Sequence, residues 1–200
     1  REREASLGSP YLRQYGLAYE AERHLFLGAF EQARRAAELA VAAIEKGGGG
    51  ELLLKARLLL AEARIHGGEL EDGARELTAA RAAIEASGAG APQAQAARLA
   101  GWLAYRREKL PEARVAWERA LDLARTEGLE GLEAELILAL HLVDRRQPGD
   151  PGKMPDLGRA SAIAERHRTP DPLALASLGL ALQHLGSGEA YDAYQRFCGR

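Results

Sequence analysis

Apolar residues recur at intervals of three and four along most of the chain, which is the spacing of one face of an α-helix. The stretch 52–63 shows the pattern, with apolar side chains at Leu52, Leu53, Ala56, Leu59, Leu60 and Ala63. No stretch shows the alternation that is typical of a half-buried β-strand. The pattern therefore predicts an all-α protein. Its helices are expected near residues 10–27, 29–46, 51–66, 70–87, 92–107, 111–127, 130–146, 156–168, 172–185 and 188–198.

The predicted helices repeat with a period of 40 residues. Three columns keep this interval: Phe30, Leu70 and Leu110; Ala33, Gly73 and Ala113; and Ala40, Ala80 and Ala120. A column of small residues in the preceding helices comprises Ala21, Ala61 and Gly101, continued by Ala139 and Gly179. Because antiparallel helices approach closely only where their side chains are short, these columns predict helix crossings. We expect a single domain over residues 1–200, made of five helix pairs at about 10–46, 51–87, 92–127, 130–168 and 172–198.

A proline- and glycine-rich segment, 147–155, interrupts the fourth pair. Insertions in repeat proteins fall on loops, so a tolerated surface loop is the favoured interpretation. A loop that contacts a partner or another domain is the alternative.

Composition limits the classes of function. The net charge is −2, and the paired arginines stand close to acidic residues, so we expect no nucleic-acid partner. No apolar run approaches the roughly 18–20 residues that span a bilayer, so we expect no membrane partner. The single cysteine, Cys198, excludes an intrachain disulfide. A reducing compartment fits this, and we expect a cytoplasmic location.

The sequence contains no pattern typical of catalysis. The five histidines are scattered, and none has a partner at a metal-ligand spacing. Gly149–Met154 superficially resembles a phosphate loop but lacks its first glycine and its Ser or Thr. Glu31 with Arg35, and Glu71 with Arg75, have the i, i+4 spacing of solvent-exposed ion pairs. We therefore expect no enzyme activity, no catalytic residue, no metal and no cofactor.

Three segments resemble tetratricopeptide repeats. They are Gly28-x-Phe30-x-x-Ala33 with Ala37 and Ala40, Gly68-x-Leu70 with Leu77 and Ala80, and Leu110-x-x-Ala113 with Trp117 and Ala120. The period of 40 exceeds the family's usual 34. It resembles the long-helix variety that is common in bacterial signalling and transcription-regulator proteins. The resemblance implies a right-handed α-solenoid whose first helices line a concave groove for peptides or protein surfaces.

The resemblance also implies where a partner binds. The exposed side of the first helices is expected to present Tyr15, Tyr19, Glu22, Phe26, Lys55, Glu62, His66, Arg98, Trp102, Tyr105 and Arg106. For any one of them, especially Trp102 or Tyr19, packing between neighbouring repeats is the alternative. The family's carboxylate clamp uses lysine and asparagine, and although Lys55 and Arg98 partly fit it, the chain contains no asparagine. Binding of an acidic C-terminal tail in that mode is therefore not expected.

The function predicted from these observations is a protein-interaction scaffold. It holds a peptide or partner domain in the groove, as the regulatory part of a larger bacterial signalling or transcription protein. Two alternatives stay open at this point. One is a sensor for a signal peptide or small ligand. The other is an accessory segment of an enzyme whose catalytic domain lies outside this chain.

Overall fold

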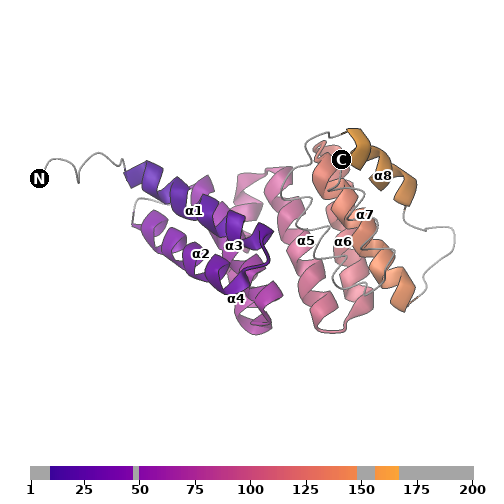
Figure 1. The fold of residues 1–200 in the computed structure, drawn as a ribbon, viewed down its shortest axis with the longest axis horizontal. Coiled ribbons are helices and arrows are strands. Elements are labelled where there is room, and N and C mark those ends of the chain that lie inside the picture. The colour runs from indigo at the N-terminus through magenta and orange to yellow at the C-terminus, as the bar shows by residue number, and fades with distance from the viewer. Residues whose placement is uncertain (1–9, 47–49, 148–155, 167–200) are drawn as a thin grey trace, which may run out of the picture. The chain divides into compact units, whose positions relative to one another are not determined.

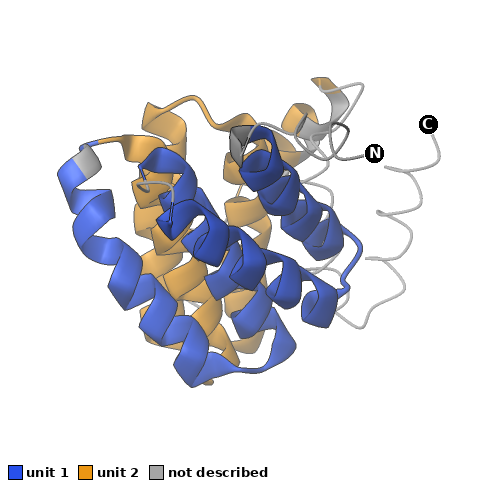
Figure 2. Ribbon diagram, turned by 90° about the vertical axis from the view of Figure 1, so that its left-hand side faces the viewer, with its two compact units in different colours: residues 1–88 blue, residues 89–200 orange. Residues whose placement is uncertain are grey.

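The computed structural model describes residues 10–46, 50–147 and 156–166, and these residues form eight α-helices and no strand. The chain divides into two compact units, 1–88 and 89–200, which are described separately below (Figure 2). The first unit contains α1 (Pro10–Phe26), α2 (Phe30–Glu45), α3 (Glu51–Gly67) and α4 (Leu70–Ser87). The second contains α5 (Gly90–Arg106), α6 (Leu110–Thr126), α7 (Glu130–Arg146) and α8 (Leu157–Arg166) (Figure 1).

Within each unit, every helix packs against the next one along the chain, as in helical-repeat proteins. In the first unit α1 also contacts α3, so the first helices of neighbouring pairs lie against each other. The expected all-α class is confirmed. The expected fifth pair, 172–198, and the insertion from Pro148 to Pro155 lie outside the described residues.

The repeat columns mark the places where helices cross. Phe30, Leu70 and Leu110 are the first residues of α2, α4 and α6. The described members of the small columns are buried, and Ala21, Ala33, Ala40, Ala61, Ala113, Ala120 and Ala139 are 0% exposed. At Gly73, a Cβ atom would lie 2.7 Å from Cγ1 of Ile65, so α3 and α4 approach too closely for any larger residue. The small side chains thus set how closely the helices pack.

The turn inside each of the first three pairs needs one residue in the left-handed region. Gly28 (φ 69°) and Gly68 (φ 94°) occupy this position in the first two pairs. Glycine carries no Cβ and adopts this conformation without strain. The third pair has Glu108 at the same position, with φ 60°. An L-residue there is held in an uncommon conformation.

None of the helices in the described part of the chain has the length and apolar character to cross a bilayer.

Candidate functional site

The exposed face of α1 carries a stripe of large apolar side chains, which we call the α1 stripe. Its members are Leu12, Tyr15, Tyr19 and Phe26, with exposed fractions of 64%, 46%, 68% and 39%. Their spacing follows the helical repeat, so all four lie on one side of the helix. Three of them, Tyr15, Tyr19 and Phe26, are residues that the sequence predicted to be exposed on this helix.

A polar pair borders the α1 stripe. Glu22 follows Tyr19 on the same side of α1 and accepts a hydrogen bond from Lys55 of α3, with Nζ and Oε2 2.9 Å apart. The lysine side chain is half exposed, at 51%. Both residues were expected on the binding face, and the structure brings them together beside the aromatic side chains.

Gly16 lies next to Leu12 and Tyr19 and is exposed. A Cβ atom at this position would meet nothing within 4 Å. Glycine inside a helix costs roughly 0.5–1 kcal/mol relative to alanine. Nothing else in the described residues comes close enough to Gly16 to require so small a side chain.

The 40-residue period relates the part of the α1 stripe around Tyr19 to a buried part of α3, whereas Lys55, the counterpart of Tyr15, is exposed. Gly16 and Tyr19 of α1 correspond to Ala56 and Leu59 of α3. Ala56 is 0% exposed and Leu59 6%, and both belong to one apolar cluster with residues of α1 and α2. The helix pair that precedes α3 therefore covers this face. The described residues leave the corresponding face of α1 uncovered.

Two further residues of α3 that were expected to be exposed are buried. Glu62 is 7% exposed and His66 5%. The His66 ring is stacked with Phe30, the first residue of α2, with centroids 5.6 Å apart. The expectation of an open face was wrong for these two residues, because the first helix pair packs over this part of α3.

In the second unit, three predicted binding residues lie in the interior. Arg98, Trp102 and Tyr105 are 1%, 1% and 8% exposed, and Arg106 is half-buried. Expecting the first three on an open surface was therefore wrong. For Trp102, the structure shows the alternative, packing between neighbouring repeats.

The buried carboxylate of Glu135 on α7 explains this placement. Nη1 of Arg98 and Nε1 of Trp102 both donate to its Oε1, at 3.1 and 3.2 Å. A buried charge is tolerated when it is paired and hydrogen-bonded, and here the carboxylate satisfies both donors of α5. These polar side chains therefore join α5 to α7 within the second unit.

Trp117 of α6 packs directly on Gly101 of α5. A Cβ atom at Gly101 would lie 2.3 Å from Cδ1 and Nε1 of this indole. Trp117 is 0% exposed, and its Nε1 donates to the carbonyl oxygen of Arg98 at 3.1 Å. Its ring contacts Trp102 edge-on, with centroids 5.0 Å apart. The small residue at position 101 is therefore required by the tryptophan opposite.

Glu133 of α7 holds two arginines together. Its carboxylate accepts hydrogen bonds from Arg125 at 3.1 Å and from Arg159 at 3.0 Å, which join α6, α7 and α8. Burial by itself raises the pKa of Glu133, but the hydrogen bonds from the two guanidinium groups outweigh this effect. The pKa of Glu133 is therefore held below its ordinary value.

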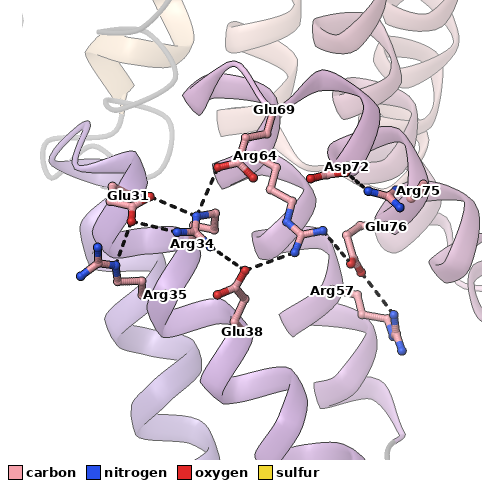
Figure 3. Close-up of polar contacts among 10 residues, drawn as sticks. All are labelled: Glu31, Arg34, Arg35, Glu38, Arg57, Arg64, Glu69, Asp72, Arg75 and Glu76. Atoms are coloured by element: carbon pink, nitrogen blue, oxygen red, sulfur yellow. Dashed lines mark hydrogen bonds and ion pairs between the residues drawn. The ribbon is translucent and has the colours of Figure 1, made fainter.

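The first unit contains an ion-pair network that was not predicted from the sequence (Figure 3). Arg64 of α3 contacts Glu38 of α2 at 3.2 Å and Glu76 of α4 at 3.1 Å. Seven residues earlier, Arg57 contacts Glu45 of α2 and also Glu76. The equal spacing of Arg57 with Arg64 and of Glu38 with Glu45 is the signal in the sequence that indicates this network. The network joins three helices.

Other ion pairs join residues three or four apart on the same helix. The predicted pair of Glu31 and Arg35 is formed, at 2.8 Å. Arg75, which was expected to pair with Glu71, makes an ion pair with Asp72. Arg34 contacts both Glu31 and Glu38 on its own helix.

No protein-family model matches this chain, and no curated protein is significantly similar to it. Among the described residues no group of histidine, cysteine or acidic side chains is arranged to hold a metal ion.

Proposed function

We propose that this chain is a tetratricopeptide-like scaffold that binds a partner protein, and that the α1 stripe receives an amphipathic helix of that partner. One observation carries the proposal. The face of α1 around Gly16 and Tyr19 is exposed, whereas the equivalent face of α3, around Ala56 and Leu59, is buried beneath a helix pair. The region that packs against helices in the second repeat thus has a counterpart in the first, and the described residues leave that counterpart uncovered.

The residues of the α1 stripe suit this role chemically. Tyrosine and phenylalanine bury a large area with few rotatable bonds, and aromatic residues are frequent among those that dominate binding energy. Gly16 allows the backbone of an incoming helix to approach closely, as Ala56 does in the fold itself. The pair of Glu22 with Lys55 forms a polar rim beside the apolar centre.

The same proposal extends to the chain's biological setting. We infer that the chain is a cytoplasmic, regulatory part of a larger bacterial signalling or transcription protein and has no catalytic activity of its own. The single cysteine and the resemblance to long-repeat regulators support this setting.

The test compares variants of the full chain as bait in a lysate of the source cells. Tyr19→Glu places a charge in the centre of the α1 stripe, and Gly16→Leu blocks the close approach. Leu39→Glu is the matched control, because Leu39 is 60% exposed on α2, outside the stripe. We expect one protein to be captured by the wild type and by the Leu39→Glu variant and lost from both others.

Capture alone does not support the proposal. A protein that binds all four baits equally, or a loss that is equal for Tyr19→Glu and Leu39→Glu, contradicts it. Far-ultraviolet circular dichroism of each variant checks that the helices are intact. We expect them to be, because Tyr19 and Leu39 are exposed and a Cβ atom at Gly16 would meet no described residue of another element within 4 Å.

A further inference from the structure

The second unit contains a polar surface cavity of about 320 Å³ that is widely open to solvent and is lined by Tyr105, Arg106, Glu108 and Arg146. Tyr105 and Arg106 lie at the end of α5, Glu108 in the turn to α6, and Arg146 at the end of α7. The lining therefore combines two guanidinium groups, a tyrosine and a single carboxylate. Arg107, Lys109 and Arg145 lie next to the lining residues along the chain, so cations predominate in these segments.

Arg146 contacts two of the other lining residues. Its guanidinium lies over the Tyr105 ring, 5.3 Å from the centroid, and it makes an ion pair with Glu108. Hydrogen bonds with Glu108 and then with Tyr105 raise the pKa of Arg146 further above its ordinary value. The guanidinium is thus oriented from two sides, while its side chain stays 41% exposed.

Glu108 has an unusual backbone. It adopts φ 60° at the turn position where the two preceding pairs have Gly28 and Gly68. A non-glycine residue in the left-handed region is strained, and such strain concentrates at functional sites. The carboxylate of Glu108 makes an ion pair with Arg146. The Glu108 side chain is 67% exposed, so solvent can take the place of Arg146 as its partner.

We propose that this cavity binds an oxyanion, which is either a carboxylate or a phosphate group. The bound oxyanion replaces the Glu108 carboxylate as the partner of Arg146. A guanidinium presents a planar fork of donors that matches either group, and Arg106 adds a second positive charge at the lining. Glu108 then acts as an internal competitor that holds the arginine in place when no ligand is bound. This site lies in the second unit and does not depend on the proposed role of the α1 stripe.

The test is a titration of the full ¹⁵N-labelled chain with inorganic phosphate and, separately, with acetate. Sodium chloride keeps the ionic strength constant, so that simple screening does not change. The signal is the Nε–H resonance of Arg146, identified by its loss in Arg146→Lys. We expect a saturable shift, with the resonance of Arg145 unaffected. A tighter response to phosphate than to acetate identifies a phosphorylated ligand, and the reverse identifies a carboxylate.

The variant that decides the matter is Glu108→Gln, which removes the competitor. It should tighten the apparent affinity about threefold, the order of effect of an exposed ion pair. Glu112→Gln is the control, because it changes the net charge equally at an exposed residue outside the cavity lining. Equal tightening in both variants, or a shift that never saturates, overturns the proposal. Arg146→Ala should abolish the effect, and the fluorescence of Trp102 and Trp117 reports whether that variant is folded.

Discussion

The crossing of α5 with α6 offers the strictest test of the packing described above. Gly101→Ala adds one methyl group at a point 2.3 Å from the indole of Trp117. The indole is 0% exposed, donates to the carbonyl of Arg98 and contacts the ring of Trp102. Any movement of the indole would therefore disturb this hydrogen bond and this ring contact. We expect the substitution to be accommodated only by displacing the tryptophan.

The magnitude follows from three contributions. Alanine improves helix propensity by roughly 0.5–1 kcal/mol over glycine. Overpacking a filled core costs typically about 1–3 kcal/mol, and weakening the hydrogen bond of Trp117 adds about 1 kcal/mol. The sum predicts that Gly101→Ala lowers the free energy of unfolding by about 1–3.5 kcal/mol. Gly101→Leu should lower it further.

The same substitution at Gly16 provides the matched control. A Cβ atom there meets nothing within 4 Å, so only the gain in helix propensity applies. Gly16→Ala should therefore raise the free energy of unfolding by roughly 0.5–1 kcal/mol. One chemical change is thus predicted to have opposite signs at two glycines of first helices.

Urea unfolding measures both effects. The chain's two tryptophans, Trp102 and Trp117, both lie in the second unit, so their fluorescence reports Gly101→Ala there. Circular dichroism at 222 nm reports Gly16→Ala. A Gly101→Ala variant as stable as the wild type refutes the assigned crossing. In a Trp117→Leu background the cost of Gly101→Ala should disappear, because the clashing indole is gone.

Three further predictions concern polar and aromatic side chains. Glu133→Gln should destabilise the second unit at pH 7. Because the pKa of Glu133 lies below its ordinary value of 4.5, its contribution to stability is present above pH 4.5 and is lost as the pH falls further. The urea midpoints of variant and wild type should therefore converge in acid. A difference that stays constant with pH would contradict the lowered pKa. Glu76→Gln should lower the free energy of unfolding by about 1–3 kcal/mol, because Arg57 and Arg64 lose a charged acceptor. Urea unfolding followed by circular dichroism measures this loss. An unchanged stability would mean that the ion-pair network is not formed in solution. Trp102→Ala should lower the free energy of unfolding by about 3–5 kcal/mol, and Arg106→Ala should lower it much less. Equally small losses for the two variants would place Trp102 on the surface.

The helices and their crossings could be predicted from the sequence because they depend on periodic features. The second helices of the first three pairs were predicted to begin at 29, 70 and 111, and they begin at Phe30, Leu70 and Leu110. The largest difference is at α5, which begins at Gly90, two residues before the predicted Pro92. Proline needs no hydrogen-bond donor in the first turn, so it is accommodated inside the helix start instead of marking it.

The burial of the polar and aromatic residues of α5 could not be predicted in the same way. A helical pattern shows which side chains share a face, but not whether another helix covers that face. Arg98 and Trp102 are buried because Glu135, 37 and 33 residues away along the chain, supplies the acceptor for both. The ion-pair network of Arg57 and Arg64 likewise depends on helices that are distant in sequence. Tyr19 stays exposed because α2 and α3 pack on the other side of α1 and the described residues place no helix over the Tyr19 face.

Site-specific photocrosslinking can show whether the α1 stripe receives a partner's helix. A photoreactive phenylalanine analogue is placed at position 19 or at position 39 of the full-length protein in its own cells, with and without Gly16→Leu. We expect one partner to be crosslinked from position 19 but not from position 39, through a segment with apolar residues at helical spacing. This adduct should be lost with Gly16→Leu. The same adducts from both positions, or none from position 19, would contradict the proposal.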